Sequence, residues 1–138
     1  MNSSIEFDVE LIQRYDLAGP RYTSYPTAVQ FHSQFGETEY LQAISDSNSS
    51  QRPLSLYVHL PFCGTVCYYC ACNKIITANR KRASPYLEDL CLEIELQAAR
   101  FSEKRPVSQL HFGGGTPTFI SDNEITNLMN KLRKHFNL

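Results

Sequence analysis

Four of the chain's five cysteines stand at positions 63, 67, 70 and 72, in a stretch that reads CGTVCYYCAC. Thiols crowded in this way can form disulfides, bind zinc or ligate an iron–sulfur cluster. An odd cysteine count fits a disulfide framework poorly. Zinc sites usually join two separate ligand pairs, whereas this chain has C-x3-C-x2-C and no second CxxC or HxxxH motif. We therefore favour an iron–sulfur cluster, with zinc and disulfides as the alternatives.

Three cysteines on one loop would leave one iron of a 4Fe-4S cluster without a protein ligand. An open iron can chelate the amino and carboxylate groups of S-adenosylmethionine, and the reduced cluster can pass an electron to its sulfonium. The spacing C-x3-C-x2-C, with an aromatic residue directly before the third cysteine, resembles the signature of the radical S-adenosylmethionine enzymes. The resemblance implies that Cys63, Cys67 and Cys70 are the ligands. A fourth bond from Cys72 would close the open iron.

Regular elements surround this loop and must hold it in place. Residues 53–61 read PLSLYVHLP, and their alternating apolar positions predict a strand. Residues 106–112 predict a second strand, and apolar residues at helical spacing follow each strand, over 85–101 and after Ser121. The order strand, loop, helix, strand, loop, helix predicts a parallel α/β arrangement. Both loops then lie at the carboxyl ends of the strands, where such folds bind ligands.

Capping residues predict where the helices begin. Thr38 is expected to cap a short helix through ETEYLQAI, and Ser84 to cap the helix after the cysteine loop. Ser121 and Glu124 form a capping box ahead of the last helix. The polar stretch SDSNSSQRP at 45–53 predicts a loop and a boundary between two parts of the chain.

A run of three glycines closes the second predicted strand, within the sequence HFGGGTPT. Glycines let the backbone approach a ligand closely and offer N–H donors without side chains in the way. By itself, such a run is explained equally well as a turn between strand and helix. In the radical S-adenosylmethionine enzymes, the matching glycine motif receives the amino group of the methionine moiety. Its position after the cysteine loop therefore strengthens the resemblance.

Longer stretches narrow the resemblance to one family. They are GPRYTSYPTA at 19–28, LYVHLPFC at 56–63, CYYCACNK at 67–74 and VSQLHFGGGTPT at 107–118. They resemble the oxygen-independent coproporphyrinogen III oxidases of bacterial haem synthesis, over essentially the whole chain. The alternative is a radical-SAM-like haem chaperone, because these proteins share the cluster loop. The chaperones continue the third cysteine as C-x-F and lack the Tyr/Pro-rich lead-in, so Cys72 and GPRYTSYPTA favour the oxidase.

The resemblance also implies a fold. The chain would be α/β and would form the first βα units of a partial TIM-type (βα)6 radical SAM barrel, after an irregular and helical N-terminal lead-in. Residues 1–50 would be the lead-in over the active site, and residues 51–138 the first two βα units of the core. Two such units cannot close a barrel, so we expect the chain to be the front portion of a longer protein. Further cofactor contacts of the family lie on later strands, which puts the activity of these residues alone in question.

The same resemblance implies which residues bind S-adenosylmethionine. Tyr57 and Gly114 would contact a first molecule. Tyr69, Gly115 and Thr116 match the contacts to a second molecule, which these oxidases are thought to hold. The cofactors expected are therefore one 4Fe-4S cluster and two molecules of S-adenosyl-L-methionine.

The implied reaction is a radical oxidative decarboxylation. It would convert two propionate side chains of coproporphyrinogen III into vinyl groups and give protoporphyrinogen IX, with an electron donor of the flavodoxin or ferredoxin type. Because the substrate carries four carboxylates, positive groups should line its pocket. Arg21 in the lead-in is the candidate for this role. His59 and Cys72 are the further candidates for substrate chemistry.

Composition limits the partners and the compartment. The 138 residues carry a formal net charge of −1 and are 42% hydrophobic, so no basic excess suggests nucleic acid. No apolar run approaches the roughly 18 residues of a membrane span. The N-terminus reads MNSSIEFDVELIQRYD and has no apolar segment of a secretory signal. We expect a cytoplasmic oxidoreductase that is monomeric at full length and binds neither nucleic acid nor membrane.

Overall fold

The computed structural model describes residues 7–16, 30–102 and 105–138. The chain divides into two compact units, Met1–Gly36 and Glu37–Leu138. In the first unit, the helix α1 (Val9–Tyr15) begins where the carboxylate of Asp8 accepts a hydrogen bond from the Leu11 N–H at 2.9 Å. Arg21, the predicted substrate-binding residue, lies outside the described residues.

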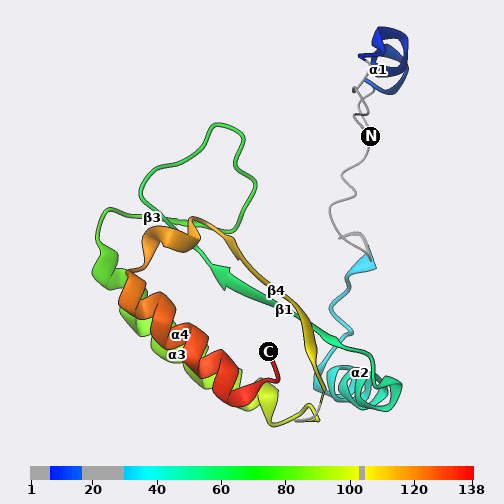
Figure 1. Ribbon diagram of the computed structural model, residues 1–138, viewed down its shortest axis with the longest axis vertical. Coiled ribbons are helices and arrows are strands. Elements are labelled where there is room, and N and C mark those ends of the chain that lie inside the picture. Colours follow the sequence, from blue (N-terminus) through cyan, green and yellow to red (C-terminus); the bar gives the residue numbers. More distant parts are fainter. Residues whose placement is uncertain (1–6, 17–29, 103–104) are drawn as a thin grey trace, which may run out of the picture. The chain divides into compact units, whose positions relative to one another are not determined.

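A parallel pair of strands forms the centre of the second unit (Figure 1). The strand β1 (Leu54–Leu60) pairs with β4 (Val107–Gly114), and the register places Leu60 opposite Gly114. Both predicted strands are therefore confirmed. β4 continues two residues beyond its predicted end, because the first glycines of the run still pair with β1.

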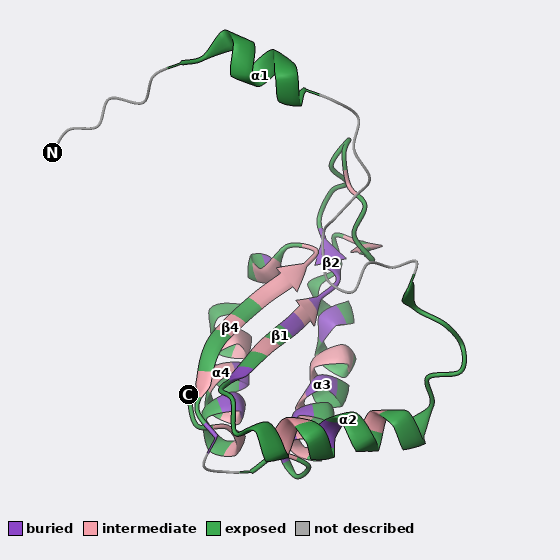
Figure 2. Cartoon of the chain, turned by 90° about the vertical axis from the view of Figure 1, so that its right-hand side faces the viewer, coloured by how far each residue is buried: buried purple, intermediate pink, exposed green. Residues whose placement is uncertain are grey.

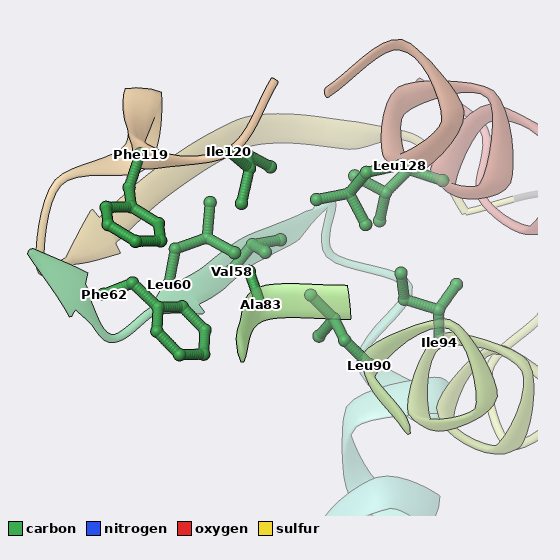
Figure 3. Packing of buried hydrophobic residues seen from close by; sticks show 10 residues of the cluster. Val58, Leu60, Phe62, Ala83, Leu90, Ile94, Phe119, Ile120 and Leu128 are labelled. Atoms are coloured by element: carbon green, nitrogen blue, oxygen red, sulfur yellow. The ribbon is translucent and has the colours of Figure 1, made fainter. Parts of the chain in front are cut away.

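Two helices pack against this sheet: α3 (Ala83–Ala98), after the cysteine loop, and α4 (Asp122–His135), after the glycine run. They run side by side in Figure 1, and their buried residues share one apolar cluster with β1. The ten buried members are Val58, Leu60, Phe62, Ala83, Leu90, Ile94, Phe119, Ile120, Leu128 and Leu132. Figure 3 shows these side chains converging between the strands and the helices. The parallel α/β order predicted from the sequence is confirmed.

The helix α2 (Glu37–Ser50) differs from its prediction at both ends. It begins before Thr38, so this threonine is not its cap, and it continues through serines that predicted a loop. The reason is a contact with a distant residue. The buried guanidinium of Arg105 donates to the Ser47 hydroxyl at 3.0 Å and to the Asn48 side-chain oxygen at 3.2 Å. These bonds hold the last turn of α2 in helical form.

The start of α3 also differs from its prediction, which gave Ser84 as the cap. A short 3-10 turn, η2 (Arg80–Arg82), precedes the helix, and the side chain of Asn79 caps this turn. The helix then begins at Ala83, which is completely buried and fixes the chain against the core. The capping box of α4 is confirmed, because Ser121 and Glu124 each accept a hydrogen bond from the other's backbone.

Within the described ranges, no helix is long and apolar enough to cross a membrane.

The expected domain boundary near residue 50 stays a prediction. The chain divides into its two compact units between Gly36 and Glu37, so α2 belongs to the same unit as the sheet.

Candidate cofactor site at the carboxyl ends of the strands

The cysteine loop is held at both of its ends by a second, very short parallel pair. The strand β2 (Phe62–Cys63) pairs with β3 (Ile75–Ile76) and so closes the loop over 64–74. The Ile75 N–H donates to the carbonyl of Pro61 at 2.7 Å, and the Thr77 N–H donates to the carbonyl of Cys63 at 2.9 Å. Figure 1 shows the loop leaving the end of β1 and returning to β3. The clamp therefore places the cysteines at the carboxyl end of β1.

Aromatic packing fixes the residue before the first cysteine. The Phe62 ring stacks on Phe119, with centroids 5.6 Å apart, and meets the Tyr86 ring edge-on at 5.5 Å. Phe62 is 2% exposed and Cys63 is 9% exposed, so both belong to the core rather than to the loop. Figure 2 shows β2 as buried, in contrast to the exposed loop that follows it. Cys63 is therefore a rigid starting point for any ligand set.

The remaining cysteines of the loop are much more accessible. Cys67 and Cys72 are exposed and Cys70 is half-buried. The Cys70 N–H donates to the Cys67 carbonyl at 3.1 Å, which forms a turn between these two residues. The N–H of Cys72 lowers the pKa of the Cys70 thiol, with a smaller contribution from Lys74. The neighbouring Cys70 in turn raises the pKa of Cys72. The thiol of Cys70 therefore ionises more readily than the thiol of Cys72.

The chemistry of these side chains fits an iron–sulfur cluster, whereas their positions do not yet form a ligand set. All five cysteines lie within the described ranges and are free thiols, and thiolates are the ligands such clusters take. Among the described residues, however, no three His, Cys, Asp or Glu side chains lie close enough together to hold a metal ion. Cluster binding would require the exposed part of the loop to close toward Cys63.

His59 connects β1 to the returning arm of the loop. Its Nε2 lies 3.2 Å from the carbonyl of Asn73, and its Nδ1 lies 3.0 Å from the hydroxyl of Tyr57. Since a carbonyl only accepts, Nε2 donates to Asn73, and in the tautomer with its proton on Nε2 the ring accepts from the Tyr57 hydroxyl at Nδ1. The Tyr57 ring also stacks on His111 of β4, with centroids 5.7 Å apart. This arrangement gives His59 a positioning role for the loop.

The glycine run is required by close packing within the chain itself. Gly114 has a φ of +99°, and a Cβ at this position would lie 2.7 Å from Cε1 of His59. A Cβ on Gly115 would lie 2.6 Å from the carbonyl oxygen of Phe62. The Gly115 N–H donates to the Leu60 carbonyl at 2.7 Å. These glycines let β4 and its following loop lie directly against His59 and the base of the cysteine loop.

Comparison with known proteins identifies the family. No family model matches the chain. A relative from Mannheimia haemolytica, named oxygen-independent coproporphyrinogen III oxidase, is 44% identical over 99% of this chain and 91% of its own length. The chain belongs to the oxygen-independent coproporphyrinogen III oxidase family. The resemblance noted in the sequence is thereby confirmed.

Longer members of the oxidase family also match over nearly the whole chain. A relative of the same name from Pseudomonas aeruginosa is 56% identical over 100% of this chain and 30% of its own length. The relative from Escherichia coli K12 is 52% identical over 96% of this chain and 28% of its length. The chain thus spans less than a third of these two oxidases.

The fold agrees with a solved oxidase structure. Coproporphyrinogen III oxidase (HemN) from Escherichia coli, described as a radical SAM enzyme, is 48% identical to the chain and superposes with a TM-score of 0.78. The match covers 96% of this chain and 28% of that one. The mixed α/β fold is that of this part of a radical SAM oxidase. The (βα)6 barrel remains a prediction.

The structure brings some of the predicted oxidase-family site residues together and separates others. Tyr57 lies beside the glycine run, because a Cβ on Gly113 would come within 2.7 Å of its ring. Tyr69 is 90% exposed on the loop, away from the core. The sequence did not predict the hydrogen bond from His59 to Asn73. Its acceptor is a backbone carbonyl, which every residue has, so no residue type indicates it.

Proposed function

We propose that the protein acts as an oxygen-independent coproporphyrinogen III oxidase. The reaction is the oxidative decarboxylation of two propionates of coproporphyrinogen III to vinyl groups, which gives protoporphyrinogen IX in haem synthesis. The observation that carries this proposal is the loop with the free thiols Cys63, Cys67 and Cys70, whose two ends are joined at the carboxyl end of β1 in a member of this family. The protein is thus proposed to be an oxidoreductase of the cytoplasm that works as a monomer.

The three thiols would hold a 4Fe-4S cluster. When bound, the cluster and S-adenosylmethionine would supply the radical chemistry that removes a hydrogen from each propionate. The chain's own part is to fix the cluster's position through Cys63, which is buried and held by backbone bonds on both sides. His59 supports this arrangement from β1, because it holds the returning arm of the loop at Asn73.

Two molecules of S-adenosylmethionine are proposed to bind around the glycine run. Tyr57, whose side chain is 59% exposed, and Gly114 would contact the first molecule. Gly115, Thr116 and Tyr69 would contact the second. What supports this assignment is that Gly114 ends β4 at the carboxyl edge of the parallel pair, where such sheets bind ligands, and that the Tyr57 ring reaches Gly113 beside it. The exposed ring of Tyr69 is available to stack on a ligand once the loop closes.

We also propose contacts of the protein to its substrate and to an electron donor. Arg21 is the proposed partner of a substrate carboxylate, and Cys72, which is exposed, is a proposed substrate-side group. The electron would come from a flavodoxin or ferredoxin. Coproporphyrinogen III is the proposed substrate, with no nucleic-acid or membrane partner.

Anaerobic reconstitution with iron and sulfide tests the proposal. We expect about four iron atoms per protein and a reducible cluster with an electron paramagnetic resonance signal. Replacing Cys63, Cys67 or Cys70 by alanine should abolish the bound iron. Cys91→Ala is the matched control, because this thiol is partly buried in α3, and its iron content should equal that of the wild type. Zinc without iron, or stable stoichiometric haem binding, would count against an oxidase.

A further inference from the structure

One hydroxyl reaches the sulfur of the buried cysteine. The Oγ1 of Thr116 donates a hydrogen bond to the Sγ of Cys63 at 3.5 Å, a contact between residues 53 positions apart in the sequence. Cys63 ends β2, and Thr116 follows directly after β4 and Gly115. Figure 2 shows the ends of these two strands next to each other. Hydroxyl donors to sulfur are longer than those to oxygen, so this distance is an ordinary one for the pair.

Backbone hydrogen bonds fix both partners of this contact. The Thr116 N–H donates to the Phe62 carbonyl at 2.8 Å, on the residue directly before Cys63. The Thr77 N–H donates to the carbonyl of Cys63 itself at 2.9 Å. The hydroxyl and the sulfur are therefore held close by the strands and not by the exposed loop. Loop closure around a cluster would leave this pair in place.

The Thr116 hydroxyl can still accept a hydrogen bond from a ligand while it donates to Cys63. A threonine hydroxyl has one proton to donate and two lone pairs that accept. Since the proton of Thr116 is directed to Cys63, only its lone pairs remain for an incoming donor. The bond to sulfur is thus a separate role from the proposed contact to S-adenosylmethionine.

We infer that Thr116 is a positioning residue for the cluster: its hydroxyl orients Cys63 and, with the cluster bound, donates a hydrogen bond to the ligand sulfur and raises the reduction potential of the cluster. This inference rests on the proposed function. The physical reason is that reduction adds negative charge to the cluster and its sulfurs. A hydrogen-bond donor therefore stabilises the reduced form more than the oxidised form.

The test is a redox titration of the reconstituted full-length protein without S-adenosylmethionine, so that the proposed cofactor contact plays no part. Thr116→Val removes the hydroxyl but keeps the shape, and the extended backbone of Thr116 (φ −109°, ψ 104°) suits a β-branched residue. At a fixed solution potential, we expect the ratio of reduced to oxidised cluster to fall about fivefold, which is about 40 mV for a one-electron couple. Thr116→Ser keeps the donor and should restore the wild-type potential.

Two controls make the result specific. Thr118→Val removes an exposed hydroxyl in the short 3-10 turn η3 (Pro117–Phe119) that directly follows Thr116, and it should leave the potential unchanged. Iron content should be the same in all variants, and the iron–sulfur stretching bands in the Raman spectrum should shift only in Thr116→Val. If this variant fails to fold, Thr116→Ala carries the same test, because it also lacks the hydroxyl.

The outcomes separate this inference from the proposed function. A wild-type protein that binds no iron overturns both. A normal cluster whose potential is the same in Thr116→Val as in the wild type overturns the inference alone. An equal shift in Thr116→Ser also overturns it, since that variant retains the donor.

Discussion

Gly114→Ala should destabilise the protein strongly, because this position combines an unusual backbone conformation with a crowded neighbour. The backbone of Gly114 has a φ of +99°, which costs a residue with a side chain roughly 1–3 kcal/mol. The new Cβ would also lie 2.7 Å from the His59 ring, so this ring must turn away.

Turning His59 away has its own cost. The ring would lose its hydrogen bonds to Tyr57 and Asn73, each contributing about 0.5–1.5 kcal/mol. Together with the backbone term, the free energy of unfolding should fall by about 2–6 kcal/mol. A typical domain has only about 5–15 kcal/mol in total, so the variant should be marginally folded.

Urea denaturation followed by circular dichroism measures this change. Gly64→Ala is the matched control, because a Cβ there would meet nothing within 4 Å, and it should change the free energy of unfolding by less than about 1 kcal/mol. A second arm repeats Gly114→Ala in a His59→Ala background. There the steric term is gone, and only the backbone cost should remain. Equal losses in both backgrounds would refute the role assigned to the histidine ring.

Two further predictions concern the helices. Leu132→Ala removes a side chain that is 2% exposed between α4 and the core, and it should lower the free energy of unfolding by about 2–5 kcal/mol in the same assay. Leu138→Ala, at an exposed position, should have a much smaller effect, and comparable losses would contradict the core assignment. Lys131, which donates to the carboxylate of Glu95, lowers the pKa of that carboxyl, so the charged form favours folding. This stabilisation should be complete above the unfolded-chain pKa of about 4.3 and lost as the pH falls through the lower folded value. The thermal midpoints of wild type and Glu95→Gln should therefore converge in acid, and a constant difference from pH 7 to pH 3 would contradict the assignment.

Local patterns predicted the elements whose causes are local. The alternation of apolar residues before Pro61 predicted β1, and the Ser121–Glu124 capping box predicted the start of α4, because both signals act over a few residues. These features depend on backbone geometry and short-range hydrogen bonds, which the order of residue types records directly.

Features that depend on distant contacts could not be predicted in this way. The last turn of α2 is helical because Arg105, 58 residues beyond Ser47, donates to it. The geometry of the candidate cofactor site also depends on contacts between distant residues. The approach of Thr116 to Cys63 depends on the pairing of β1 with β4 and on the bond from the threonine N–H to Phe62. No spacing along the chain encodes such a distance.

The clamp formed by β2 and β3 has a consequence for the assembly of a cluster. Because the two ends of the loop are already joined, the entropy of closing this loop is lost during folding and not during metal binding. Cys63 and Cys67 are joined by no more than about 14 Å of chain, so an iron ion bound at either has the other tethered close to it. A tether this short gives the second thiol a millimolar or higher effective concentration. Once one thiol of the loop held an iron ion, the others would thus follow without a further cost of closing the loop.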